Sequence, residues 1–535
     1  MPKFRPLACL MLAALAFNAS AAEPDRDIIN RIADTGFNHG EVMDLAEYLA
    51  DRIGGRMTNS PAMRQAEHWT QDKFKGWGLA NVHLEPYEFG RGWWIETASA
   101  RMVGPRPFDL KEIPLAWTPA TKGSLRAPIV VAPMKHERDF ADWKGKLAGK
   151  IVLVTYPYPQ RDDSESPFKR YEDADLGKVS KAQEPHYNPD QVDKALEGSR
   201  FAHKLDDFLA AEGAVAIVKM SRLEGRLVHG DQGWGYRPDQ APHLPAAELA
   251  AEDYRMLTRL AKGGEVTIEL NHNVHYEDKD TKANDVLAEI PGRDPKAGFV
   301  MAGAHLDSWV AGTGAADNGA GSVVVMEAAR ILAHLDRKPK RTIRFALWSG
   351  EEQGLLGSNA WIEKHIAKRP PSSDPLVGST EHYMRPAFPV TTLPEYGELA
   401  AYFNLDNGSG KIRGIYTEGN FAVAPIFTQW LAPFATLGAT TVSSQSTGGT
   451  DHLYMARIGL PAFQFIQDPL DYGSRVHHTD LDVYDHLRGD DLRQAAVIMA
   501  SFLWMAAESD QPLPKSVVPT EPKVTDPFAY KDPAD

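Results

Sequence analysis

The chain has 535 residues, of which 43% are hydrophobic and 24% are charged, and its formal net charge is −14. This balance is typical of globular proteins large enough to bury more than one core, and it excludes disordered and collagen-like chains. An acidic chain is poorly suited to phosphate backbones, so we expect no nucleic-acid partner.

The first 22 residues predict a secretory signal peptide. Lys3 and Arg5 precede an apolar run from Leu7 to Phe17, and small residues follow it at positions 19–22. The run is shorter than the roughly 20 residues that a membrane-spanning helix needs. The single cysteine, Cys9, lies inside this segment, so we expect no disulfide or thiolate ligand in the mature chain. The sequence therefore predicts a periplasmic or secreted protein without a membrane anchor.

Helical periodicity opens the mature chain, from Val42 to Ile53 and again from Ala62 to Trp77. From about Gly123 short β-rich runs take over, including Ala127 to Ala132 and Lys150 to Tyr156. This change predicts a β-rich module at residues 123–275, inserted into a larger domain whose first part is 23–122.

From Asn284 strand-like and helix-like segments alternate, which is typical of a parallel α/β sheet. The expected strands are 286–290, 299–304, 342–348 and 400–405, and the expected helices are 322–335, 355–366 and 492–508. The Pro-rich stretch 369–394 is predicted to be a surface insertion, and the tail 511–535 is predicted to be an extended segment. The predicted fold class is α/β, with a mixed, largely parallel central sheet flanked by helices and completed by residues 276–510.

Potential metal ligands follow several of the predicted strands. They are His305, Asp307, Asp317, Glu351, Glu352 and Asp406, followed downstream by His477, His478, Asp480 and Asp482. A single carboxylate at a strand end is usually a helix cap or a solvated loop residue. Ligands of an open parallel sheet, however, bind beyond the carboxyl ends of its strands, where this whole set converges. We therefore predict a metal site built from histidine and carboxylate ligands.

Three motifs carry a family resemblance. They are Ala302-Gly-Ala-His305-Leu-Asp307-Ser308, Gly314-Ala-Ala-Asp317-Asn318-Gly-Ala-Gly321 and Trp348-Ser-Gly-Glu351-Glu352-Gln-Gly-Leu-Leu-Gly357-Ser358. With Asn404-Leu-Asp406 and His478-Thr-Asp-Leu-Asp482, they resemble the co-catalytic two-zinc aminopeptidase family of the MH clan. That family includes bacterial secreted aminopeptidases, glutamate carboxypeptidase and carboxypeptidase Q. The early segment from Asp51 to Pro86 is most similar to carboxypeptidase Q.

The resemblance implies a zinc exopeptidase fold that holds two Zn²⁺ per chain. It makes Asp317 the bridging carboxylate, with His305 and Glu352 completing one zinc site and Asp406 and His478 the other. His478 is preferred over His477 because it directly precedes Thr479, as the ligand does in the family.

The same resemblance assigns roles around the ligands. Glu351 becomes the general base that activates water, and Asp307 the acid that orients His305. In this family the peptide bond between Asp317 and Asn318 is often cis. The loop ending at His452 resembles one in which a polar side chain faces the tetrahedral intermediate.

The inserted module is similar to a protease-associated domain, through Leu147 to Val154 and Gly213 to Ile217. Together, the signal peptide and the resemblance imply an exported exopeptidase acting on short peptides, an aminopeptidase or a dipeptidase. Two alternatives are a metal-free binding homologue and a single-zinc cyclase or acylase of the same fold. Arg385, Arg413 and Arg475 could each grip a substrate carboxylate, although each is more simply a solvated surface residue. The sequence does not indicate an oligomeric state.

Overall fold

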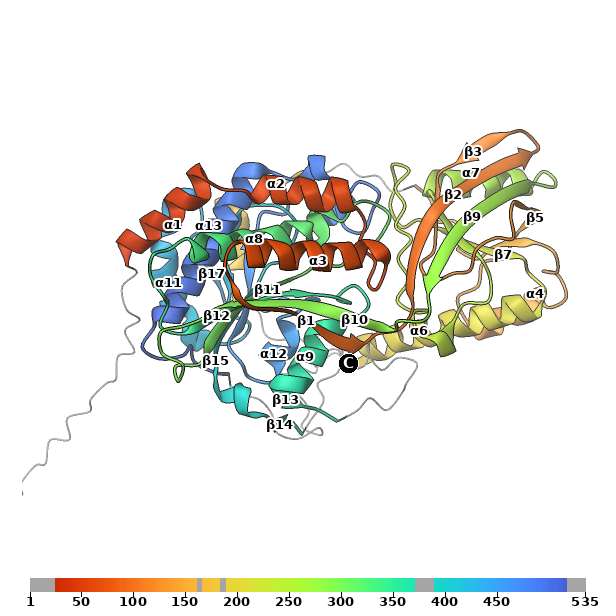
Figure 1. Cartoon of the computed structure of the whole chain (residues 1–535). Helices are drawn as coiled ribbons and strands as arrows, with labels where there is room; N and C mark the ends of the chain where they lie inside the picture. Colours follow the sequence, from red (N-terminus) through yellow and green to blue (C-terminus); the bar gives the residue numbers. More distant parts are fainter. Residues whose placement is uncertain (1–24, 161–165, 183–188, 371–388, 517–535) are drawn as a thin grey trace, which may run out of the picture.

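The computed structural model describes residues 25–160, 166–182, 189–370 and 389–516. The predicted signal peptide, the tail from residue 517 and residues 371–388 of the predicted surface insertion lie outside these ranges. Within the described ranges, no helix is both long and apolar enough to cross a membrane. Two eight-stranded sheets organise the chain, and they occupy the two ends of the molecule in Figure 1.

The first sheet has the mixed, largely parallel character that the sequence predicts. Its strands are, in spatial order, β1 (Ala80–Glu88), β10 (Lys282–Ile290), β12 (Thr342–Trp348), β11 (Phe299–His305), β15 (Leu399–Asn404), β18 (Ala462–Gln467), β16 (Ile412–Tyr416) and β17 (Thr441–Ser443). The central strands β12, β11, β15 and β18 are parallel, whereas β10 is antiparallel to both of its neighbours. Strands buried on both faces form continuous apolar runs, and this explains why the sequence locates them so closely.

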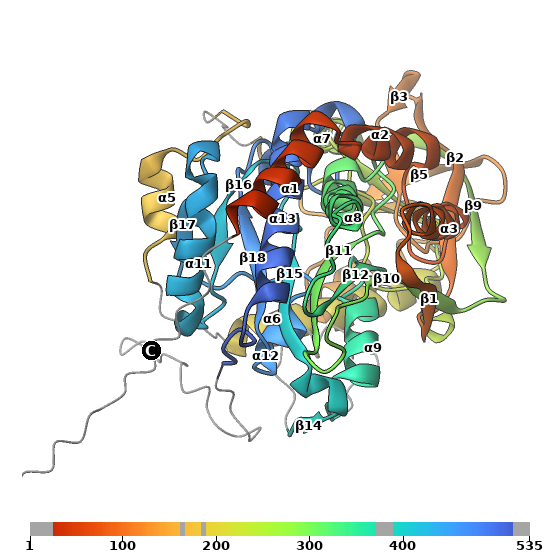
Figure 2. The same cartoon turned by 60° about the vertical axis from the view of Figure 1, so that its left-hand side comes forward.

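Helices cover both faces of this sheet. One face carries α1 (Arg26–Asn38), α2 (Val42–Glu47), α3 (Pro61–Gly76), α8 (Ala320–Ala333), α11 (Ala424–Leu431) and α13 (Gly489–Glu508), and the other carries α9 (Leu356–His365) and α12 (Leu453–Arg457) (Figure 1 and Figure 2). The predicted helices 62–77, 322–335, 355–366 and 492–508 correspond to α3, α8, α9 and α13. Ser60 begins α3 by accepting a hydrogen bond from the Met63 amide at 3.2 Å, and Pro61 takes the first helical position.

The second sheet belongs to the inserted module. In spatial order it contains β3 (Phe108–Leu110), β2 (Gly92–Gly104), β9 (Thr267–Glu277), β5 (Leu125–Val131), β6 (Ile151–Leu153), β7 (Ala216–Met220), β8 (Ala246–Leu249) and β4 (Glu112–Pro114). Strands β5 to β8 are parallel and pack with the helices α6 (Pro189–Ala211) and α7 (Ala251–Ala261). This half of the module is therefore a small α/β layer.

The predicted start of the module at Gly123 is too late. Strands β2, β3 and β4 precede Gly123 in the chain but lie in the second sheet. The long antiparallel pair of β2 and β9 joins residues far apart in the sequence, from Gly92 opposite Glu277 to Gly104 opposite Thr267. The middle of β2 is exposed, so it lacks the buried apolar pattern that marks the later strands. The change in sequence composition near Gly123 therefore predicts only the buried strands of the module.

Candidate metal centre

The side chains that were predicted to converge follow four adjacent parallel strands. His305 is the last residue of β11, Glu351 and Glu352 follow β12, Asp406 follows β15, and His478 comes after β18. Asp317 lies in the short helical turn Ala315–Gly319 that leads into α8. Because parallel strands end at one edge of the sheet, all six side chains meet there.

His305 lies at the centre of one group. Its Nε2 is 3.3 Å from Asp406 Oδ1, 3.5 Å from Asp317 Oδ1 and 3.9 Å from Glu351 Oε2. The His305 side chain is only 1% exposed, so this group is shielded from solvent.

His478 lies at the centre of the second group. Its Nε2 is 3.1 Å from Glu352 Oε2 and 3.3 Å from Asp317 Oδ2, the other oxygen of the carboxylate that faces His305. A cavity of about 10 Å³, close to the volume that one small bound species needs, is lined by Asp317, Glu352 and His478. His477 stacks on His478 with ring centres 3.7 Å apart and is 43% exposed, and its Nε2 is 3.7 Å from Asp317. The geometry thus favours His478 over His477.

The partition of ligands that the resemblance implied is wrong. Asp406, rather than Glu352, lies with His305, and Glu352 lies with His478. The physical reason is that Glu351 and Glu352 are consecutive residues whose side chains diverge. Glu351 turns toward His305, and Glu352 turns toward His478.

The donor set fits a metal. Asp317 Oδ2 and Glu352 Oε1 are buried without a hydrogen-bond partner among the described residues, and such atoms are costly unless something compensates them. Each histidine uses Nδ1 elsewhere and leaves Nε2 facing the acids. His305 Nδ1 donates to the backbone oxygen of Asp307 at 3.0 Å, and His478 Nδ1 is 3.1 Å from Asp231 Oδ2. Imidazole and carboxylate ligands with such outer partners suit zinc.

Electrostatics in the site are strongly perturbed. Burial raises the pKa of Glu351 well above its usual range, and the Asp406 and Glu352 charges add to this effect. Burial, reinforced by the Asp317 charge, raises the pKa of Glu352 to about 7. Burial also disfavours an ionised Asp317, but the His305 hydrogen bond and the His478 charge hold its pKa well below the usual range. A concentration of buried acids of this kind is stable when cations balance it.

Asp307 holds the loop after β12. Its carboxylate accepts hydrogen bonds from the backbone amides of Glu351 and Glu352, both at 3.4 Å, and from the Thr58 hydroxyl at 2.9 Å. The same carboxylate lies 3.6 Å from His305 Nδ1. Asp307 therefore fixes both glutamates and one histidine.

Arg56 and Asp482 brace the Asp317 turn. Asp482, one of the potential ligands in the sequence, accepts from backbone amides here, and no sequence pattern singled out Arg56. The fully buried Arg56 guanidinium donates to the backbone oxygens of Leu306, Thr313 and Gly314 at 2.7–2.8 Å. Asp482 accepts from the Asp317 amide at 3.0 Å and from the preceding amide at 2.6 Å. The peptide bond between Asp317 and Asn318 is cis, as the resemblance suggested.

A loop of the inserted module reaches the metal centre. Asp231 contacts His478 from a position 247 residues earlier, and Arg222 Nη1 pairs with both oxygens of Asp231 at 2.9 and 3.0 Å. The same loop is anchored by a pair of hydrogen bonds in which the Val228 amide donates to Asp480 Oδ1 at 3.1 Å and the Asp480 amide donates to the Val228 oxygen at 3.2 Å. No sequence pattern singled out Asp231, because its role depends on how the module docks.

Four other predicted positions belong to neither of the two groups. His452 is fully buried beside Glu418, with its Nε2 3.4 Å from Glu418 Oε1, and its expected role stays a prediction. Arg413 forms an ion pair with Asp468 at 2.9 Å and is 14% exposed, so its role is structural. Arg475 is exposed, and Arg385 lies outside the described residues.

A largely parallel sheet with this buried set of histidines and carboxylates at its carboxyl edge forms a candidate zinc centre. A model of peptidase family M28 matches residues 285–503. Carboxypeptidase Q of Bos taurus is 28% identical over 88% of this chain and 85% of its own.

Solved structures agree. A peptidase M28 precursor from Shewanella amazonensis is 25% identical, with a TM-score of 0.65 over 93% of this chain and 99% of that one. A zinc aminopeptidase from Bacillus subtilis shares the fold at 18% identity, with a TM-score of 0.55 over 88% and 98% of the two chains. These similarities, together with the family M28 match over residues 285–503, identify the chain as a zinc metallopeptidase.

Proposed function

We propose that this metallo-exopeptidase binds two zinc ions and releases single residues from short peptides, as an aminopeptidase or a dipeptidase. The observation that carries the proposal is the Asp317 carboxylate, whose two oxygens face different histidines at 3.5 and 3.3 Å. Asp406 joins the first group and Glu352 the second. Each group thus has three protein ligands, the number that leaves a catalytic zinc open to substrate.

The ligands of this proposal are His305, Asp317, Glu352, Asp406 and His478. When bound, zinc supplies Lewis acidity that polarises a peptide carbonyl and activates water. The protein's part is to hold these five side chains in place, to exclude other water and to move a proton.

Glu351 is the proton carrier in this proposal. Its carboxylate is 3.9 Å from His305 Nε2, and the Asp307 carboxylate fixes its backbone. It takes a proton from the attacking water and delivers it to the amine that leaves when the peptide bond breaks. Its burial keeps solvent from competing for that proton.

Asp231 and Asp307 position the two histidines. Asp307 engages Nδ1 of His305, and Asp231 engages Nδ1 of His478. Both contacts fix the ring orientation and increase the basicity of Nε2. The proposed centre is therefore shared between the catalytic domain and the inserted module.

The restriction to short peptides follows from the position of the module. Its loop contacts His478 directly. Trp117 of the module also packs against Trp309, with the ring centres 6.1 Å apart, and Trp309 lines the small cavity at the metal centre. We infer that a cover so close to the centre admits a chain end and excludes a folded protein. We further propose that residues 1–22 direct export and that the module is a protease-associated domain.

An aminopeptidase or dipeptidase is the first candidate specificity. A carboxypeptidase is the second, and the alignment with carboxypeptidase Q over most of both chains favours it. A panel of dipeptides to tetrapeptides, free or blocked at either end, tests the proposal. We expect release from the free peptides and almost none from casein. Rapid internal cleavage of a peptide blocked at both ends would refute the exopeptidase assignment, and one zinc per fully active chain would refute the dinuclear centre.

A further inference from the structure

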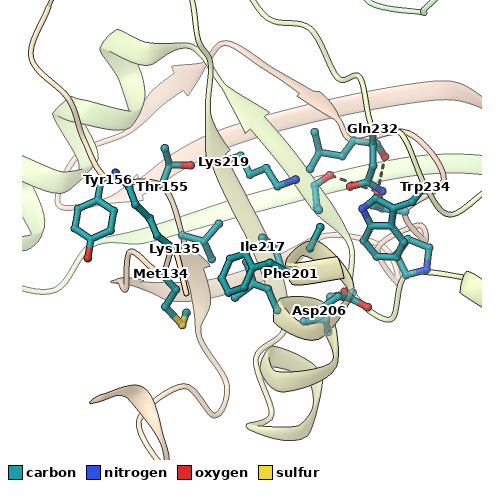
Figure 3. Close-up of a pocket in the computed structure, with 18 residues that line it drawn as sticks. Met134, Lys135, Thr155, Tyr156, Phe201, Asp206, Ile217, Lys219, Gln232 and Trp234 are labelled. Atoms are coloured by element: carbon teal, nitrogen blue, oxygen red, sulfur yellow. Dashed lines mark hydrogen bonds between the residues drawn. The ribbon is translucent and has the colours of Figure 1, made fainter. Parts of the chain in front are cut away.

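A second cavity lies within the inserted module and shares no lining residue with the small cavity at the metal centre. It has a volume of about 260 Å³ and lies between α6 and the parallel half of the second sheet. Its walls are largely apolar and include Met134, Val154, Phe201, Leu205, Ile217 and Leu244 (Figure 3). These walls would favour the hydrocarbon part of a ligand.

The cavity occupies the place where α/β sheets usually bind ligands. Strands β5, β6 and β7 are parallel, and the residues that follow β5 and β6 line the cavity, among them Lys135, Thr155 and Tyr156. The carboxyl ends of parallel strands form such ligand crevices in open α/β sheets. The position in the fold thus points to a binding site independently of the chemistry of the walls.

Lys219 gives this apolar cavity one specific group. It lies on β7 among buried residues, and Figure 3 shows its ammonium directed into the cavity, toward the side where Gln232 and Trp234 lie. Among the described residues, no acceptor lies within hydrogen-bond or ion-pair distance of this ammonium. The lysine is half-buried, and burial lowers its pKa although the charges of Glu248, Asp231 and Asp206 oppose the shift.

The three acids near Lys219 are already engaged. Glu248 accepts from the His229 amide at 2.9 Å, Asp231 pairs with Arg222 at 2.9 Å, and Asp206 accepts from a backbone amide at 2.8 Å. A half-buried ammonium without a close partner in an apolar cavity is stabilised when an anion reaches it. Lys135, exposed at the rim and 4.9 Å from the ring centre of Tyr156, adds a second positive charge.

We propose that this cavity binds a small carboxylate with an aliphatic or aromatic body. The carboxylate pairs with Lys219 and the body fills the apolar space. The cavity is smaller than the roughly 300–1,000 Å³ of pockets for drug-sized ligands, so the ligand is a single short chain or ring. Such a carboxylate has two sources, a simple organic acid or a free amino acid with an apolar side chain. Asp206 lines the same cavity and could receive the ammonium of an amino acid.

Titration calorimetry of the zinc-loaded protein, without peptide substrate, tests this proposal. The probes are phenylacetate, L-phenylalanine, phenethylamine and benzyl alcohol. We expect at least one of the two carboxylates to bind with a Kd below about 1 mM, and the amine and the alcohol to bind at least tenfold more weakly. Lys219→Met should weaken carboxylate binding about tenfold to a hundredfold, because hydrogen bonds to charged groups contribute about that much.

Two controls separate this cavity from other sites. Lys262→Met removes an exposed lysine of the same module and should leave binding unchanged. Carboxylates that bind at the metal centre would be insensitive to Lys219. Ala202→Phe fills the cavity from α6 without changing Lys219, and it should abolish binding if Lys219→Met proves hard to produce.

Tighter binding of L-phenylalanine would identify an amino acid as the ligand, and tighter binding of phenylacetate a simple acid. Absence of carboxylate binding at millimolar concentration would overturn the proposal, as would equal binding of the amine or retention of full affinity in Lys219→Met. Peptide hydrolysis should be unchanged in Lys219→Met, so failure here leaves the proposed peptidase mechanism unaffected.

Discussion

Replacing Asp231 should selectively weaken one of the two proposed zinc sites. Asp231→Ala removes the acceptor 3.1 Å from His478 Nδ1 and frees the imidazole ring to rotate. His305 and Asp406, in the other group, keep all their contacts. We therefore expect the zinc near His478 to bind more weakly and the zinc near His305 to keep its affinity.

The expected magnitude follows from the contact itself. A hydrogen bond to a charged group contributes about 1.5–3 kcal/mol, and loss of an outer partner of a metal ligand typically costs about 10–100-fold in affinity. These values agree, since tenfold corresponds to about 1.4 kcal/mol. Arg222, the other partner of Asp231, is 49% exposed, so water replaces its lost ion pair at little cost.

Competition with a chromophoric chelator measures the two zinc affinities separately from activity. Asp231→Asn should fall between wild type and Asp231→Ala, because it keeps an acceptor but loses the charge. Asp480→Asn is the matched control, since it weakens the anchoring of the same loop but leaves Asp231 in place. If Asp231→Ala bound both ions within twofold of wild type, the positioning role would be refuted. An equal loss in Asp480→Asn would show that loop docking, rather than ring orientation, sets the affinity.

The remaining predictions concern catalysis, metal removal and pH. Glu351→Gln should keep both metals, by elemental analysis, yet lose about a thousandfold in kcat. Asp317→Asn should instead lose metal. Loss of metal in Glu351→Gln would show that Glu351 is a ligand. Chelation should abolish activity but leave the far-ultraviolet circular dichroism intact, because the sheet core packs through apolar contacts. Loss of the helical signal would contradict this prediction. Hydrogen bonds to Glu395 and Glu85 raise the pKa of His365 to about 9. The charged imidazole therefore contributes its full share to the free energy of unfolding below the ordinary histidine pKa of about 6.5. This contribution is lost as the pH rises through about 9. His365→Gln should therefore lower the urea midpoint at pH 6 by an amount equivalent to about 1 kcal/mol, given solvent screening, and have almost no effect at pH 10; an equal effect at both pH values would exclude this charge.

The sequence predicts the catalytic sheet well because its central strands are buried on both faces. Strand β12 begins and ends at the predicted residues, Thr342 and Trp348. Once those strands are located, the rule that ligands gather at their carboxyl ends brings His305, Glu351 and Asp406 together without knowledge of the strand order.

The parts that the sequence did not predict depend on side-chain direction and on docking. The division of ligands between His305 and His478 depends on how Glu351 and Glu352 diverge, and a linear motif does not record this. Asp231 contacts the site across 247 residues. Strand β2 joins the inserted module by pairing with β9, and its exposed centre gives no apolar signal.

The loop of the inserted module that contacts His478 links zinc binding to the packing of the two domains. Thermodynamic coupling is reciprocal, so whatever free energy the docked module adds to zinc affinity, bound zinc adds to the docking of the module. The amides of Val228 and Asp480, which bridge the two domains, report this directly through hydrogen exchange. Removal of zinc should thus first increase the rate of amide hydrogen exchange at the domain boundary, while the amides of the apolar cores on either side stay protected.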